Sequence, residues 1–141
     1  MKPLDYQRQI PEVLQAFIKA QAAISSGDLS PTLVELIKIR ASQINGCAFC
    51  LDMHLRDARK QGESSERLDR IIVWRQVHDF TPAEQAVLSW TETLTTIDPK
   101  TDYATERAKL EAHFEEKEIA LITTSIAMIN LWNRMQVHNH A

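Results

Sequence analysis

The amino-acid sequence predicts an all-α protein that forms one helical-bundle domain over residues 1–141. Three glycines and five prolines are too few turn residues for a sandwich or a barrel. Apolar residues recur at spacings of three and four in several segments, and no segment shows the alternation typical of strands. A chain of 141 residues fits one domain with its own core, and no linker or repeat divides it.

In the first part of the chain, two helices are expected, followed by a segment that carries two cysteines. The first helix is predicted over 11–25 and the second over 31–44, where a Ser-Pro pair supplies the N-cap and the first helical residue. The Asn45-Gly46 pair is a stop signal that allows the chain to fold back. A third helix is expected to follow at once, over 47–62.

Four further helices complete the prediction. Their expected ranges are 64–72, 82–97, 103–113 and 116–137. Thr81 and Glu84 form a capping box around Pro82 at the start of the second of these. The last helix is apolar on two faces, so it is either the central helix of the core or part of a subunit interface.

Charge and hydropathy exclude several classes of function. The net charge of −3 and a pI near 5.9 give no basic surface for nucleic acid or an anionic membrane. No apolar run reaches the length of roughly 18–20 residues that spans a bilayer. The first residues lack the apolar centre of a signal peptide. We therefore expect a cytoplasmic location, where a CxxC pair is typical of redox or metal chemistry.

The two cysteines of the chain, Cys47 and Cys50, are separated by two residues, and His54 follows four residues after the second. On a helix these three side chains share one face, together with Ala58. Cys47 falls at the helix start, where unpaired backbone N–H groups stabilise a thiolate. A vicinal dithiol beside a base is the natural unit of thiol–disulfide chemistry.

Either cysteine could be the attacking thiol. The helix start favours Cys47, whereas the imidazole of His54 favours Cys50. We expect Cys50 to attack, because His54 can remove its proton and return it, and Cys47 to resolve the product into a disulfide. Asp57 could orient the imidazole, or it could simply be solvated.

Glu35 lies twelve residues before Cys47, among apolar residues of the preceding predicted helix. If that helix folds back against the cysteines, burial would raise the pKa of the carboxyl group and suit Glu35 to be a general base or proton relay. The alternative is a surface ion pair with Lys38, at a spacing of three.

These residues carry a specific resemblance. Glu35, Cys47-Ala-Phe-Cys50 and His54 resemble the core motif of the AhpD-like alkylhydroperoxidase branch of the carboxymuconolactone decarboxylase superfamily. The sequences LIKIRASQINGC over 36–47 and INLWNR over 129–134 are similar as well. The match is strong over 30–62 and clear in the last helix, which together make up about half of the chain.

The resemblance implies an all-helical fold that assembles as a homo-oligomer, a trimer or a hexamer. It implies reduction of hydroperoxides by the cysteine pair, with Glu35 and His54 in a proton relay and no metal or flavin. The disulfide would be reduced again by an external dithiol, either dihydrolipoyl or thioredoxin-like. Members without the cysteines are lactone decarboxylases, and the dithiol argues against that activity here.

Phe49 departs from the family pattern. The best-known members have a second histidine at this position, and a phenylalanine passes no protons, so the relay would be shorter. This motivates an alternative function as a thiol–disulfide oxidoreductase or redox sensor with little peroxidase turnover.

A non-enzymatic, metal-binding helical module is a further alternative, with the two thiolates, Glu35 and His54 as ligands. Structural zinc usually has four cysteine or histidine ligands, and the chain has no second cysteine pair.

Several residues have no motif around them. His78, His113, His138 and His140 are in this group, and the last two are expected to be exposed in the tail. The tryptophans, Trp74, Trp90 and Trp132, are expected to anchor the core or an interface. The polar residues of the last helix, Asn130, Asn133 and Arg134, either form a subunit contact or border the active site.

Overall fold

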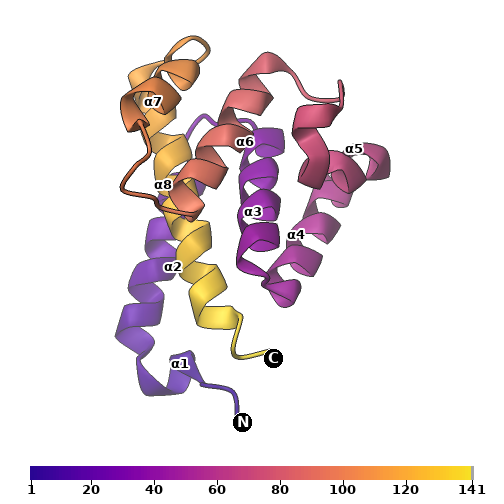
Figure 1. Cartoon of the computed structure of the whole chain (residues 1–141). Helices are drawn as coiled ribbons and strands as arrows, with labels where there is room; N and C mark the ends of the chain where they lie inside the picture. The colour runs from indigo at the N-terminus through magenta and orange to yellow at the C-terminus, as the bar shows by residue number, and fades with distance from the viewer. Residues whose placement is uncertain (141) are drawn as a thin grey trace.

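The computed structural model describes residues 1–140, which form eight α-helices and one 3-10 helix without any strand among them (Figure 1). The elements are α1 (Tyr6–Gln9), α2 (Pro11–Ser25), α3 (Pro31–Asn45), α4 (Ala48–Lys60), α5 (Ser65–Arg70), η1 (Ile71–Gln76), α6 (Pro82–Thr95), α7 (Tyr103–Glu111) and α8 (Glu116–Gln136). The all-α prediction is confirmed. No helix in this range is long and apolar enough to cross a membrane.

Side-chain caps set the helix boundaries that the sequence indicated. The hydroxyl of Ser30 accepts a hydrogen bond from the N–H of Leu33 at the start of α3 (3.3 Å). Thr81 and Glu84 form the expected capping box at α6, with bonds of 3.1 and 2.9 Å. Gly46 ends α3 at a φ of 66°, a left-handed conformation that costs glycine little. The chain can therefore turn directly from α3 into α4.

Helix α3 lies at the centre of the molecule and packs against α4, α6 and α8 (Figure 1). Two apolar clusters hold it. One joins α3 to α6, α7 and α8, and its members include Ile37, Val87, Trp90, Leu110, Ile122, Ile126 and Ile129. The other joins α3 to α4, α5, η1 and α6 through Leu36, Ile39, Leu68, Ile71 and Leu88. Burying each such side chain contributes about 1.5–3 kcal/mol.

The two apolar faces of α8 are explained within one chain. This helix packs against α3, α6 and α7, and against α2 and α4 as well, so it is a central helix of the core. Its Ile122, Ile126 and Ile129 are buried, whereas Leu121, Trp132 and Met135 on the second face are half-buried.

Two elements differ from the prediction. Helix α6 ends at Thr95, and Ile97, which was expected to continue its apolar stripe, is exposed. The chain after α5 continues as the 3-10 helix η1. A 3-10 helix places residues three apart on the same side, and here Ile71 and Trp74 are both buried. The indole N–H of Trp74 then donates to Glu92 (2.7 Å).

The two ends of the described chain lie together beside α2 and α8 (Figure 1). The backbone N–H of Leu4 donates to the side chain of Asn139 (2.8 Å), whose amide donates back to the carbonyl of Leu4 (3.0 Å). The hydroxyl of Tyr6 donates to the carbonyl of Met135 (2.8 Å). The N-terminal segment thus holds the chain that leaves α8.

Candidate active site

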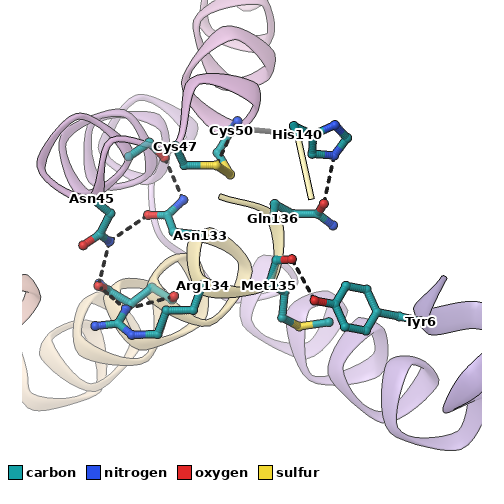
Figure 2. Close-up of a disulfide and its surroundings, with 11 residues drawn as sticks. Tyr6, Asn45, Cys47, Cys50, Asn133, Arg134, Met135, Gln136 and His140 are labelled. Atoms are coloured by element: carbon teal, nitrogen blue, oxygen red, sulfur yellow. Dashed lines mark hydrogen bonds between the residues drawn. A yellow bond between two sulfur atoms is a disulfide. The ribbon is translucent and has the colours of Figure 1, made fainter. Parts of the chain in front are cut away.

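Cys47 and Cys50 form a disulfide at the start of α4 (Figure 2). Their Cα atoms are 5.3 Å apart. Cys47 is the N-cap residue, and its sulfur accepts a hydrogen bond from the backbone N–H of Cys50 (3.3 Å). Both residues are buried, with exposed fractions of 1% and 2%. The positive end of the helix dipole therefore acts on both sulfur atoms.

A network of amide side chains holds the turn that leads into this disulfide (Figure 2). The amide of Asn45 donates to Asn133 (2.9 Å) and to Asn130 (3.0 Å), and the amide of Asn133 donates to Ser42 (3.1 Å). Arg134 donates to the side chain of Asn130 (2.9 Å). The polar residues of α8 therefore tie this helix to the end of α3 inside one chain, next to the first cysteine.

The cysteine–histidine face of α4 forms as the spacing predicted. Cys50, His54 and Ala58 are the buried residues of this helix. The exposed fraction of His54 is 8%. The imidazole therefore stands in the interior, one helical turn beyond Cys50.

Glu35 of α3 lies against His54. The Oε2 atom of the glutamate is 3.7 Å from the Nδ1 atom of the histidine. Both atoms are buried and neither has a hydrogen-bond partner among residues 1–140. Glu35 is 7% exposed, and the described residues show no ion pair between it and Lys38. The surface ion pair is thus wrong, because the turn at Gly46 folds this face of α3 onto α4.

Burial acts on both members of this pair and favours their neutral forms. It raises the pKa of Glu35, against the field of the Lys38 ammonium, which lowers it. Burial also lowers the pKa of His54 to about 4, with Lys38 acting in the same direction and Asp57 opposing it. Burial thus favours a neutral imidazole at His54 and shifts Glu35 toward its protonated form.

A cavity of about 360 Å³ opens beside Cys50. Its lining comes from α2, α3, α4 and α8 and consists of Gln21, Lys38, Phe49, Cys50, Met53, His54, Ile129, Trp132 and Gln136. Cys47 is not part of the described lining. Trp132, expected as a core or interface anchor, lines this cavity, whereas Trp74 and Trp90 are buried as predicted.

A second cavity, of about 300 Å³, lies on the other side of Glu35. Its lining is Thr32, Glu35, Ala58, Gln61, Gly62, Glu63 and Arg67. Glu35 faces this second cavity, and His54 faces the one at Cys50. The buried pair therefore separates the two spaces and is placed to carry a proton from one to the other.

The C-terminal residues lie at the mouth of the Cys50 cavity, which the sequence did not indicate. The ring of His140 stacks on Phe49, with centroids 3.8 Å apart, and its Nε2 atom is 3.0 Å from the side-chain oxygen of Gln136 (Figure 2). His138 was expected to be exposed, yet it is half-buried beside the hydroxyl of Tyr6 (3.1 Å). The contacts with Phe49 and Tyr6 join residues more than 80 positions apart, so no local sequence pattern could predict them.

The remaining histidines take no part in the site: His78 and His113 are exposed elsewhere. Ligand atoms of Glu35, His54 and Asp57 lie within 4.8 Å of one another, a spacing that could suit a metal ion. The ammonium of Lys38 acts on the first two residues, and its positive charge opposes a cation there. This set also differs from the predicted one, because the two sulfur atoms are joined to each other.

Fold and site together define a class: an all-helical protein with a cysteine pair at a helix start, beside a buried acid–imidazole pair. The chain belongs to the carboxymuconolactone decarboxylase family, which matches residues 11–93.

Individual relatives extend this result. The chain is 34% identical to YdfG of Bacillus subtilis (strain 168), an uncharacterized protein, over 134 residues, which are 95% of this chain and 91% of that one. It resembles a crystal structure from Agrobacterium tumefaciens with a TM-score of 0.92 and 36% identity, over 100% of this chain and 97% of the other. That protein is of unknown function, with a suggested role as the antioxidant defence protein AhpD.

A second structure, from Ralstonia eutropha JMP134, is an uncharacterized peroxidase-related protein described as an alkylhydroperoxidase AhpD core. Its TM-score is 0.78 at 23% identity, over 92% of this chain and 69% of that one. This likeness shows the shared fold.

Proposed function

We propose that the protein is a dithiol peroxidase that reduces organic hydroperoxides or hydrogen peroxide through Cys50 and Cys47. The observation that carries the proposal is the Cys47–Cys50 disulfide, of which Cys50 lines a cavity shared with His54. The relationship to AhpD-like proteins supports the same chemistry.

The reaction takes place in two steps. The Cys50 thiolate attacks one oxygen of the peroxide, a sulfur–oxygen bond forms and the oxygen–oxygen bond breaks. The alkoxide leaves as an alcohol with the proton that His54 took from the Cys50 thiol. The Cys47 thiol then loses its proton and attacks the sulfenic acid of Cys50, the sulfur–oxygen bond breaks, and the departing hydroxide takes up that proton and leaves as water. Two thiols are oxidised and one peroxide is reduced.

In this proposal Glu35 is the second proton carrier of the relay, after His54. Its carboxyl group stands 3.7 Å behind His54, beyond hydrogen-bond distance in the disulfide form. A small approach of the two side chains would close a hydrogen bond. Glu35 also faces the second cavity, so solvent there can replace a proton without entering the reaction cavity.

Access to the disulfide favours small reactants. Both cysteines are almost fully buried, and Cys50 is reached through the cavity. A peroxide can enter this space, whereas a folded protein with a surface dithiol cannot. We therefore propose that a dithiol on a slender arm, of the dihydrolipoyl type, reduces the pair better than a thioredoxin-like protein. The same argument weakens the alternative function as an exchanger of protein disulfides.

We also propose that the chain acts as a homo-oligomer, a trimer or a hexamer, in a cytoplasmic location that supplies such dithiols. Light scattering on the purified protein measures the subunit count. A monomer at working concentrations would contradict this part of the proposal.

Turnover by single variants tests the chemistry. The reduced protein is mixed with cumene hydroperoxide and excess dihydrolipoamide, and peroxide loss is followed. Cys50→Ser should abolish turnover. Cys47→Ser should stop after one event, with a sulfenic acid on Cys50 that a carbon nucleophile traps for mass spectrometry. His54→Asn should slow turnover by about 10²-fold or more.

The exposed histidine variant His78→Asn serves as the matched control and should turn over as the wild type does. Full activity of Cys50→Ser, or a trapped sulfenic acid on the other cysteine, would contradict the assigned roles. Stoichiometric metal in the purified protein, with activity unaffected by thiol alkylation, would favour the metal-binding alternative.

A further inference from the structure

Lys38 is a cation without a partner in the reaction cavity. It follows Glu35 by one helical turn on α3, is half-buried, and lines the cavity with Cys50 and His54. Among the hydrogen bonds and ion pairs of residues 1–140, none involves its ammonium group. Removing an ammonium from water is costly unless a counter-charge or hydrogen bonds replace the water.

No other residue of the described lining carries a full charge at neutral pH. The lining otherwise consists of two amides, apolar side chains, the sulfur of Cys50 and the imidazole of His54, which burial keeps neutral. The field of the ammonium reaches both Glu35 and His54. A cavity with one positive charge is suited to hold one negative charge.

Reduction of the disulfide creates that negative charge at Cys50. The charged and titratable groups around Cys50 are few. Lys38 lines the same cavity from α3, Glu35 lies behind His54 and lines the second cavity, and His54 and Asp57 lie further along α4. Helices α2 and α8 contribute only uncharged residues to the lining, and from the tail His140 stacks on Phe49. Glu35 lies outside the lining of this cavity and shares no ion pair with Lys38, and burial disfavours its charged form.

We propose that Lys38 is a positioning residue whose ammonium holds reduced Cys50 as a thiolate and balances the negative charge that develops on the departing oxygen. The helix start contributes to the same effect on the thiolate, but its partial charge is shared with Cys47. The second half of the proposal rests on the proposed peroxidase activity. The first half rests on the charge of the cavity alone.

A thiol titration tests it without any peroxide. In Cys47→Ser protein, Cys50 is the one remaining thiol, and the rate of its alkylation by iodoacetamide is measured against pH. Adding Lys38→Met should raise the pKa of the Cys50 thiol by about one unit, as expected for loss of a charge roughly 10 Å away, across the cavity, at an effective dielectric constant of about 20. Lys38→Arg should restore most of the shift.

Lys60→Met, at the exposed end of α4, removes the same charge away from the cavity and should leave the titration unchanged. Thermal unfolding of each variant checks that the fold is intact, and Lys38→Gln, which also removes the charge, serves if Lys38→Met fails to fold. An unchanged thiol pKa in Lys38→Met would overturn the proposal. So would a variant whose only defect is a raised KM for hydroperoxides that bear a carboxylate, because Lys38 would then bind substrate.

The outcome is separable from that of the proposed function. A Lys38-dependent thiol pKa in a protein that consumes no hydroperoxide would reject peroxidase activity and leave the role of Lys38 at the thiolate in place. Peroxide turnover in a protein whose thiol pKa does not depend on Lys38 would support peroxidase activity and reject the role of Lys38.

Discussion

The Nδ1 atom of His54 lies 3.7 Å from the Oε2 atom of Glu35, and both atoms are buried without a hydrogen bond. Each side chain belongs to a different helix, and each faces a different cavity. Burial disfavours the charged form of both groups, so the pair is not a resting ion pair. The first two predictions derive from this buried pair.

Protonation of His54 should destabilise the fold in acid. The folded pKa of about 4 lies below the unfolded value near 6.5, so the unfolded chain binds the extra proton first. Stability from this group is complete above pH 6.5 and is lost as the pH falls to about 4, by an amount on the order of 3 kcal/mol. Urea unfolding of the disulfide form between these pH values measures the slope.

The matched variant is His54→Asn, which cannot take up the proton. Its free energy of unfolding should fall less steeply over the same pH interval. Carboxylates with a lowered pKa, such as Glu84, also lose their stabilising contribution in acid, but equally in both proteins. Equal slopes for variant and wild type would show that His54 is not held neutral by burial.

Glu35→Gln should stabilise the protein at alkaline pH while it impairs turnover. The folded pKa of Glu35 is raised above its unfolded value, so its stabilising contribution is present below about pH 4.5 and is lost as the pH rises through the folded value. The neutral glutamine has no such loss. Urea unfolding at several pH values from 5 to 9 should therefore show the variant gaining on the wild type. If the variant instead loses stability relative to the wild type as the pH rises, the pKa of Glu35 is lowered in the folded protein and our assignment is wrong.

The amide network around Asn133 should contribute to the free energy of unfolding through several hydrogen bonds. Asn133→Leu keeps a similar volume but removes one of the two hydrogen bonds of the Asn45 amide, which keeps Asn130, and removes the hydrogen bond that Ser42 accepts. We expect a loss of about 2–4 kcal/mol in the free energy of unfolding, because unpaired buried polar groups are costly. Arg134→Ala, on the exposed side of the same helix, should lose less than about 1 kcal/mol. If both variants are equally stable, the network does not support the turn.

Phe49 should determine which hydroperoxides are used. It lines the cavity and is 42% exposed, so an apolar substituent of the substrate can contact its ring. Phe49→Ala should lower kcat/KM for cumene hydroperoxide by about tenfold and affect hydrogen peroxide much less. Ile72→Ala removes an exposed apolar side chain outside the described cavity lining and serves as control. An equal loss for both peroxides would mean that Phe49 acts on the cysteines instead.

The local part of the site could be predicted from the sequence. A spacing of three, four and four placed Cys47, Cys50, His54 and Ala58 on one face, and the face is buried. The Asn45-Gly46 stop signal predicted the return of the chain that brings Glu35 to His54. These inferences rest on helical periodicity and on turn chemistry, both of which act over a few residues.

The parts that failed or were missed depend on distant contacts. Nothing near Trp132 indicates that it lines a cavity, because its position follows from the packing of α8 on α2 and α4. Both tail histidines were expected to be exposed; His140 is, but His138 is half-buried beside Tyr6, and Phe49 stacks on His140 from a distant part of the sequence. The spacing of three suggested an ion pair between Lys38 and Glu35. The carboxyl group is instead buried, where its charged form is disfavoured, so Lys38 has no ion pair with it.

A single-turnover experiment tests the central claim most directly. Reduced protein is mixed with one equivalent of cumene hydroperoxide in the absence of other thiols, and free thiols and cumyl alcohol are counted together. Our account predicts that two thiols disappear for each alcohol formed, that a Cys47–Cys50 disulfide is found by mass spectrometry, and that dihydrolipoamide restores both thiols. Intact thiols beside unreacted peroxide, on the time scale of turnover, would contradict a dithiol peroxidase.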